Sequence, residues 1–300
     1  MHWLDVAYLL FTRRVKLFHR GWGEIEPVLD AAQPLLKQHE PPPLQIEWKP
    51  IGGTMSFGTV KSPCTLLPEK SRDIQVLRVS PKKPVRARVV LPPSWGDEGF
   101  HQRKFGFGAL LDEGIELWLL EGPFFGGRRD GGRLQMGTVR EFVIMGLANV
   151  LEARALVGAA RADGSPVAVA GFSMAGLLGA QAVATLPWEV PVVAMSAGDT
   201  ASAIFLSGPL SKTVAFDALG LDAKERLREL FDRTRLQVLP PPRSKKRVVV
   251  ATRRDGLVPP ESMERLAAHW QVEPRWVDSG HLGAYVFHRK VLQRAVLDVL

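Results

Sequence analysis

Ser173 lies where a short hydrophobic run gives way to a run of small residues, in the sequence VAVAGFSMAGLLGAQAVATL. A strand, a sharp turn and a helix in this order are typical of a nucleophile elbow, which exposes a serine at the top of a parallel sheet. The turn needs small neighbours, and Gly171 and Ala175 supply them, with alanine in place of the commoner glycine. An isolated serine before a helix would more often be a cap. The flanking pattern favours a nucleophile.

Two further residues follow in the order that such a serine requires, first an acid and then a histidine. Asp255 lies in the turn RRDGLVPP after the run RVVVA, and His281 lies in GHLGAY after RWVDS. In this interpretation His281 removes the proton as Ser173 attacks an acyl carbonyl, and Asp255 fixes the histidine tautomer. Water then hydrolyses the acyl-enzyme. The pattern predicts a Ser-His-Asp triad.

Other interpretations of the acid and the histidine stay open. Asp199 follows PVVAMSAG, one strand earlier than Asp255, and is the competing acid. Asp278 is too close in sequence to His281 to be favoured. A loop aspartate and a hydrogen-bonded core histidine are the non-catalytic alternatives for the pair.

Catalysis at an acyl carbonyl also needs N–H donors for the developing oxyanion. The first expected donor is the backbone N–H of Met174, directly after the serine. The second should come from the loop LPPSWGDEGFHQRK, where Pro92 and Pro93 carry no N–H. This leaves Ser94 or Trp95, of which we favour Ser94.

Aromatic residues near these donors are expected to contact substrate. Trp95 lies in the same loop, and Phe124 and Phe125 lie in EGPFFGGRRDGG, where they would line an acyl pocket. Arg128 and Arg129 would then meet an anionic head group, but we favour a glycine-rich structural turn with solvated arginines. No metal-ligand cluster or phosphate-binding loop motif occurs in the sequence, so we expect no metal and no cofactor.

Short strand-like runs alternate with longer helical patterns along the chain, which predicts an α/β fold with a mostly parallel central sheet and helices on both faces. The strand-like runs are 86–91, 115–120, 167–170, 191–195 and 247–251, with antiparallel edge strands at 44–48 and 73–79. The helical patterns are 138–161, 174–186, 261–270 and 284–299. Residues 200–245 are too long for a simple crossover, and we interpret them as a cap insertion that contains a helix in DAKERLRELFDRT.

Composition favours one domain over residues 1–300, because 300 residues with 46% hydrophobic content can bury a full core. The single cysteine, Cys64, cannot form an intramolecular disulfide, which fits either a reducing compartment or indifference to redox. We expect a cytoplasmic location. The net charge of +8 favours anionic partners such as phospholipid surfaces. Nucleic acid is not expected, because the basic residues are scattered and no recognised motif occurs.

Residues 1–20 predict an amphipathic helix rather than an export signal, because the apolar stretch precedes the basic cluster. One side would carry Trp3, Leu4, Ala7, Tyr8 and Phe11, followed by Arg13, Arg14, Lys16, His19 and Arg20. The helix either packs on the domain or contacts a membrane surface. No run of eighteen apolar residues occurs, so we expect a soluble or peripheral protein.

Several separated segments resemble the alpha/beta-hydrolase domain-containing protein 18-like branch of the alpha/beta-hydrolase superfamily. They are LFHRGWG, LPPSWGDEGFHQRK, LLEGPFFGGRR, GFSMAG, TASAIFLSGPLSK and GHLGAY. The resemblance implies an alpha/beta-hydrolase fold, a nucleophile at Ser173, a histidine at His281 and, by position, an acid at Asp255. The loop LPPSWGD departs from the LAGTGD-like pattern of the family, and Ala175 replaces a glycine.

The expected function is cleavage of an acyl ester, including a lipid ester, by a serine hydrolase. A noncatalytic binding scaffold is the first alternative, because Pro92 and Pro93 remove two possible oxyanion donors. Acyl transfer to another alcohol is the second, since it would use the same residues.

Overall fold

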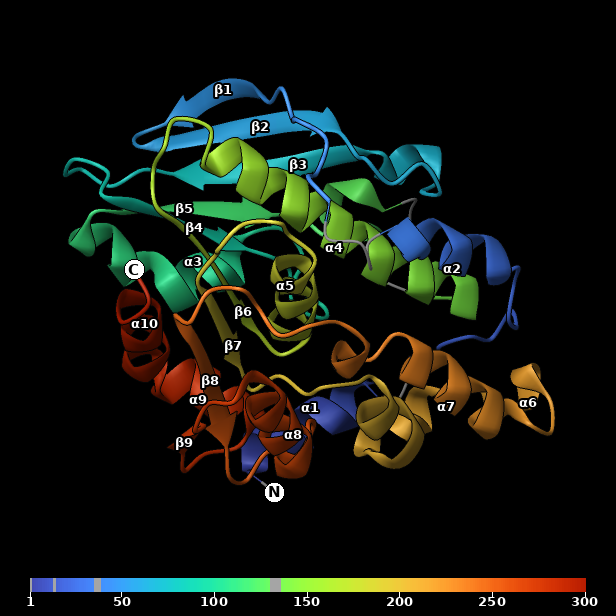
Figure 1. The fold of residues 1–300 in the computed structure, drawn as a ribbon. Helices are drawn as coiled ribbons and strands as arrows, with labels where there is room; N and C mark the ends of the chain where they lie inside the picture. Colours follow the sequence, from blue (N-terminus) through green and yellow to red (C-terminus); the bar gives the residue numbers. More distant parts are fainter. Residues whose placement is uncertain (1, 13–14, 35–38, 130–135) are drawn as a thin grey trace.

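A nine-stranded sheet in the order β1-β2-β3-β5-β4-β6-β7-β8-β9 forms the centre of the described chain (Figure 1). The structure is a computed structural model that describes residues 2–12, 15–34, 39–129 and 136–300. The strands are β1 (Glu47–Gly52), β2 (Met55–Lys61), β3 (Asp73–Val79), β4 (Ala87–Leu91), β5 (Ile115–Leu120), β6 (Val167–Phe172), β7 (Val192–Met195), β8 (Arg247–Thr252) and β9 (Arg275–Val277). β4 to β9 run parallel to their neighbours, whereas β1, β2 and β3 form an antiparallel edge against β5.

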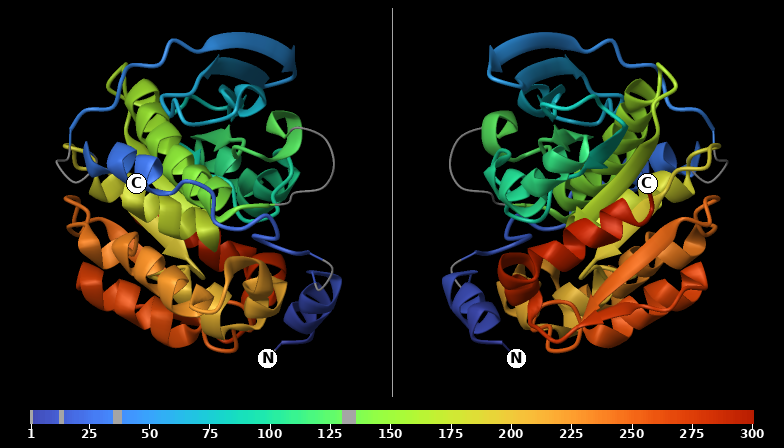
Figure 2. Two further views of the ribbon diagram at one scale, coloured as in Figure 1. Left: turned by 90° about the vertical axis from the view of Figure 1, so that its right-hand side faces the viewer. Right: turned by 90° about the vertical axis from the view of Figure 1, so that its left-hand side faces the viewer.

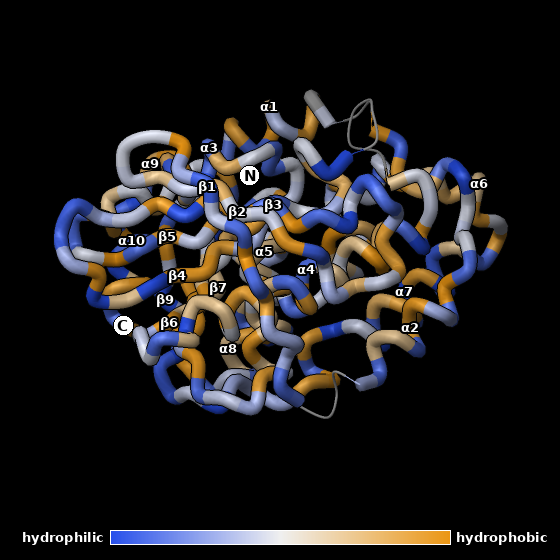
Figure 3. The backbone as a smooth tube through the Cα atoms, turned by 90° about the horizontal axis from the view of Figure 1, so that it is seen from above, coloured by the Kyte–Doolittle hydropathy of each residue, from blue (hydrophilic) through white to orange (hydrophobic). Residues whose placement is uncertain are grey.

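Helices cover both faces of the sheet, so alternate strand residues enter two separate cores. Val90 and Val169 belong to the first core, while their neighbours Val89 and Ala168 belong to the second. The first core is covered by α2 (Glu26–Ala32), α4 (Val139–Ala160), α5 (Met174–Ala184) and α8 (Pro260–Trp270). The second is covered by α3 (His101–Phe107), the 3₁₀ helix Gly108–Glu113, α9 (His281–Phe287) and α10 (Arg289–Leu297). Figure 3 shows the apolar segments gathered in the interior and the hydrophilic ones towards the periphery.

Most of the predicted strands and helices are present, with several differences. β1 lies later than the predicted 44–48, and β2 was not predicted because it is mostly half-exposed and carries no clear apolar alternation. The predicted helix 284–299 is two helices, because the backbone leaves the helical conformation at His288. The first of them begins at His281, three residues earlier than predicted.

Residues 200–245 form a run of short helices after β7. The elements are the π-helix Ala203–Ser207, the 3₁₀ helix Pro209–Thr213, α6 (Phe216–Leu219), α7 (Ala223–Arg233) and the 3₁₀ helix Leu236–Val238. Their apolar residues form a third core together with Leu17, Phe18 and the start of α4. The predicted helix in DAKERLRELFDRT corresponds to α7.

The amino-terminal helix α1 (Trp3–Thr12) is shorter than the predicted span of 1–20 and lies at the periphery, beside the segment after β7 (Figure 2). Its burial differs from the predicted pattern, since Trp3 and Ala7 are exposed whereas Asp5 is completely buried. Arg13 and Arg14, expected in the basic cluster, lie outside the described residues. Among the described helices, α4 is long and apolar enough to cross a membrane, but 67% of its apolar window is buried, as in a core helix.

A buried ion pair joins the loop after β5 to α4. The guanidinium of Arg128 donates to Glu152 at 2.6 Å and 2.7 Å, and both side chains have no exposed surface. The same guanidinium donates to the backbone oxygens of Ser71 and Glu121. Arg128 is therefore a structural residue, as the favoured interpretation of this turn expected, but it is buried and not solvated. Arg129 pairs with Glu98 at 2.6 Å.

Removing one partner of this pair should be strongly destabilising, because the other charge would stay buried without compensation. We expect Glu152→Gln to lower the free energy of unfolding by about 3–5 kcal/mol, measured by urea denaturation. Lys61→Ala, which removes an exposed ion pair with Asp73, is the control and should cost less than about 1 kcal/mol. A Glu152→Gln loss as small as that of the control would contradict a structural role for the pair.

Candidate functional site

Ser173 sits on a strained turn between β6 and α5. Its backbone has φ 58° and ψ −127°, a conformation that residues with a side chain rarely adopt. Its N–H donates to the oxygen of Met195 at 2.8 Å, which ties the turn to the neighbouring strand. A side chain at Gly171 would overlap the backbone of Ala175, so glycine is needed for this close approach. The serine thus lies on a sharp strand-to-helix turn at the carboxyl end of a central strand.

His281 and Asp255 meet at the same edge of the sheet. His281 Nδ1 lies 2.8 Å from Asp255 Oδ2, and both side chains are buried. Asp255 Oδ1 accepts the N–H groups of Leu257 and Val258 at 2.9 Å and 2.8 Å, while Thr252 Oγ1 donates to Oδ2 at 2.6 Å. Burial alone would raise the pKa of Asp255, but His281 and these donors hold it below its usual value. The carboxylate thus stays ionised and fixes the orientation of the imidazole.

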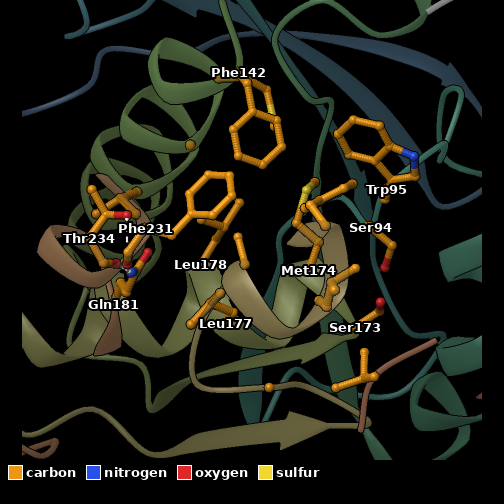
Figure 4. A pocket seen from close by; sticks show the side chains of 18 of the residues that line it. Ser94, Trp95, Phe142, Ser173, Met174, Leu177, Leu178, Gln181, Phe231 and Thr234 are labelled. Atoms are coloured by element: carbon orange, nitrogen blue, oxygen red, sulfur yellow. Dashed lines mark hydrogen bonds between the residues drawn. The ribbon is translucent and has the colours of Figure 1, made fainter. Parts of the chain in front are cut away.

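A cavity of about 470 Å³ opens beside Ser173 and His281. Ser94 and Trp95 line it too, and Figure 4 shows the hydroxyls of Ser94 and Ser173 on the same side of the space. Most of the wall is apolar, including Phe142, Met174, Leu177, Leu178, Phe205 and Phe231. On the opposite side Gln181 Nε2 donates to the oxygen of Thr234 at 2.7 Å (Figure 4).

The two predicted oxyanion donors lie next to each other at this cavity. Met174 is the first residue of α5, where a backbone N–H has no partner within the helix. The hydroxyl of Ser94 donates to the oxygen of Phe172 at 2.8 Å, which attaches the loop after β4 to the elbow. Among the described residues, the backbone N–H groups of Met174 and Ser94 have no protein acceptor. Both residues line the cavity.

The aromatic residues predicted to contact substrate divide into two groups. Trp95 lines the cavity and packs against Phe142 and Phe205, with ring centroids 6.0 Å and 5.8 Å away. Phe124 and Phe125 are not among the described residues that line it. Phe125 is fully buried and lies behind Trp95, with the ring centroids 6.5 Å apart. The placement of these two phenylalanines as pocket residues is therefore corrected, because their turn folds back into the core.

Most of the cavity wall was not predicted from the sequence. Phe142 lies on α4 and Phe231 on α7, and Tyr8 of α1 also lines the space. Amphipathic spacing identifies the buried face of α7 but not the partner of that face. Asp5 was missed as well, and its carboxylate accepts a hydrogen bond from the backbone N–H of His281 at 2.9 Å.

Asp199, the competing acid, is held elsewhere. Its fully buried carboxylate accepts hydrogen bonds from Ser262 Oγ at 2.5 Å, Arg265 Nη2 at 3.0 Å, Gln237 Nε2 at 2.9 Å and Arg235 Nη2 at 3.2 Å. Burial raises the pKa of Asp199, but these donors lower it by more, so the pKa lies below its usual value. This carboxylate links the loop after β7 to α8.

A resident metal has no obvious place in the described part of the chain. No group of three or more His, Cys, Asp and Glu side chains that could hold a metal ion occurs there. The only cysteine, Cys64, is buried, and burial raises the pKa of its thiol to about 11. A thiol with this pKa stays protonated at neutral pH and is a poor nucleophile.

The family described as "Alpha/beta hydrolase domain containing 18" matches residues 15–226 and 221–300 of this chain. The chain belongs to this family. The fold agrees with solved alpha/beta hydrolases, among them the acetyl xylan esterase of Paenibacillus sp. R4, with a TM-score of 0.64 and 16% identity over 98% of this chain and 99% of that chain.

Two other solved structures are similar to this member of the alpha/beta hydrolase domain containing 18 family. Acetyl xylan esterase 1 of Thermoanaerobacterium sp. JW/SL YS485 has a TM-score of 0.59 and 15% identity over 98% of each chain. An alpha/beta serine hydrolase without lid from Xanthomonas campestris has a TM-score of 0.53 and 15% identity, covering 84% of this chain and 98% of that chain. At this identity the likeness shows the fold, and together with the family it supports a hydrolase-like function.

The lowered pKa of Asp199 gives a test of its ion pairs through stability. A folded-state pKa below the unfolded value stabilises the fold above about pH 3.9, and the contribution is lost as pH falls through the folded value. Asp199→Asn should lower the free energy of unfolding by about 1–3 kcal/mol at pH 7. The difference from wild type should shrink below about pH 4 in urea titrations. A difference that grows on acidification would refute the assigned ion pairs.

Proposed function

We propose that this protein is a serine hydrolase that cleaves an acyl ester with Ser173, His281 and Asp255 as its triad. The observation that carries the proposal is geometric: a serine on a strained strand-to-helix turn opens into the same cavity as a buried histidine that is hydrogen-bonded to a buried carboxylate. Three solved proteins of similar fold are named as esterases or serine hydrolases.

The proposed reaction proceeds through an acyl-enzyme. Ser173 Oγ bonds to the acyl carbon while His281 Nε2, the ring nitrogen not bonded to Asp255, takes the hydroxyl proton. The tetrahedral intermediate then expels the alcohol, which receives that proton. Water then attacks the acyl carbon while His281 takes a proton from it. The second tetrahedral intermediate expels Ser173 Oγ, which receives that proton, and the carboxylic acid is released.

The negative oxygen of the intermediate would be stabilised by the N–H groups of Met174 and Ser94. Met174 also lies at the amino terminus of α5, an eleven-residue helix whose dipole favours negative charge there. Pro92 and Pro93 remove two donors, but the residue that follows them lines the cavity and is attached to the elbow through its hydroxyl. The prolines therefore do not argue for a noncatalytic scaffold.

We further propose that the acyl group is long and apolar, as in a lipid. The volume of the cavity lies in the usual range of small-molecule sites, about 300–1,000 Å³, and its walls are mainly aromatic and aliphatic. Residues 200–245 contribute Phe205, Leu210 and Phe231 to these walls, which is the role of a cap.

A lipid substrate would enter from a membrane surface, and α1 offers a suitable contact. Trp3 and Leu10 are 66% and 54% exposed, and Val6 between them is exposed too. Tyr8, on another side of the same helix, lines the cavity. The apolar surface thus adjoins the proposed acyl site, and the net charge of +8 favours an anionic bilayer. We propose a peripheral location at such a membrane.

The triad is tested by labelling the purified protein with a fluorophosphonate and mapping the modified peptide. We expect labelling at Ser173 and none in Ser173→Ala, because only an activated serine reacts.

Asp255→Asn should slow ester hydrolysis by about 10³–10⁴-fold, since the histidine tautomer is no longer fixed. Asp199→Asn is the matched control and should retain nearly the wild-type rate. Folded wild-type protein that stays unlabelled and hydrolyses no activated ester would favour a binding scaffold instead.

The membrane contact is tested with the double variant Trp3→Ala/Leu10→Ala. Losing two large apolar side chains from the interface should reduce hydrolysis of a fluorescent ester in phosphatidylglycerol-containing vesicles by about tenfold or more. Hydrolysis of a short soluble ester should be unchanged. Ile51→Ala on β1, which is 52% exposed in the wild type, is the control and should change neither rate. Equal loss on both substrates would show damage to the site rather than to membrane contact.

A further inference from the structure

Asp5, on the amino-terminal helix, has a completely buried carboxylate that accepts three backbone N–H groups. Oδ2 accepts from Gly256 and from His281, each at 2.9 Å, and Oδ1 accepts from Leu282 at 2.9 Å. Hydrogen bonds from a backbone N–H to an ionised carboxylate are among the stronger ones in proteins. One side chain thus joins three segments that are far apart in the chain.

Each of these N–H groups belongs to a loop of the proposed triad. Gly256 directly follows Asp255, while His281 and Leu282 form the first turn of α9. The N-cap position of α9 is Gly280, which has no side chain to accept the free N–H groups of that turn. Asp5 supplies the acceptor from another helix and places a negative charge at the end of α9 that favours it.

The glycine before His281 allows this approach. Gly280 has φ −81°, which any residue can adopt, so space and not backbone conformation requires glycine there. A Cβ at Gly280 would lie 2.6 Å from Asp5 Oδ2 and would overlap His2. In the GHLGAY motif, the glycine directly before the histidine therefore leaves the space that α1 needs to approach His281.

We propose that Asp5 is a positioning residue of the active site, holding the backbone of His281 and the loop of Asp255 so that their 2.8 Å hydrogen bond keeps its alignment. This inference rests on the proposed function of the triad. Asp5 does not line the cavity, whereas Tyr8 of the same helix does, so its action is on the histidine and not on substrate binding. A displacement of about 1 Å at such a site can cost about 10²-fold in rate.

Asp5→Asn tests the proposal, because the amide keeps the size of the side chain but loses an acceptor and the charge. We expect kcat for a soluble activated ester to fall by about 10- to 100-fold, with KM within about twofold of wild type. Fluorophosphonate labelling of Ser173 should slow to a similar extent. Asp163→Asn, at an exposed aspartate, is the control. That aspartate accepts hydrogen bonds from Arg88 and Ser165, before the start of β6, and its variant should keep the wild-type kcat.

A double-mutant cycle separates positioning from a general loss of fold. In a His281→Ala background, adding Asp5→Asn should change the residual rate by less than about twofold, because the residue it positions is gone. An equal fractional loss in both backgrounds would overturn the proposal. If His281→Ala itself keeps full activity, the proposed triad is wrong. If His281→Ala is inactive while Asp5→Asn is fully active, only the present inference fails.

Gly280→Ala gives a second route in case Asp5→Asn does not fold. It keeps the Asp5 carboxylate but prevents α1 from bringing it to the N–H groups of His281 and Leu282. It should therefore produce the same loss of kcat with little change in KM. A folded Gly280→Ala variant with wild-type kcat would overturn the proposal.

Discussion

The backbone strain at Ser173 is the constraint on which the site depends. A residue held at φ 58° and ψ −127° persists only when its surroundings stabilise the conformation. Here β6 lies between β4 and β7 in the middle of the sheet, and α5 packs on it directly after the turn. Both cores therefore contribute to holding one serine in an unfavourable conformation, with its side chain facing the cavity.

The loops around this serine are held by buried charges. Asp97 pairs with Arg103 after β4, Arg128 with Glu152 after β5, and Asp199 with Arg265 after β7. Asp255, which follows β8, pairs in the same way with His281, which follows β9. Parallel strands end at a common edge, and each loop at that edge needs an anchor that satisfies its polar groups. Ion pairs of this kind follow several strands of the sheet, and one of them is proposed to take part in the chemistry.

This arrangement explains which features could be predicted from the sequence. The strand and helix pattern, the sharp turn at Ser173 and the pairing of Asp255 with His281 follow from local motifs and chain order, because parallel topology brings successive strand ends together. Arg128 and Asp199 were candidates for chemistry by type and position, yet both are structural anchors. A structural anchor differs from a residue that takes part in chemistry in its burial and in its hydrogen-bond partners. Neither property can be predicted from the spacing of nearby residues in the sequence. The aromatic walls and Asp5 depend on contacts between distant segments.

The bond between Asp5 and His281 spans 276 positions of the chain. Contacts of such wide sequence separation form late in folding, since the entropy of closing the loop must be overcome before they contribute. The sheet and the first core can therefore form before the amino-terminal helix docks on the segment of His281. Hydrolytic competence would then appear after compaction, as a separate kinetic phase that begins when the amino-terminal helix docks.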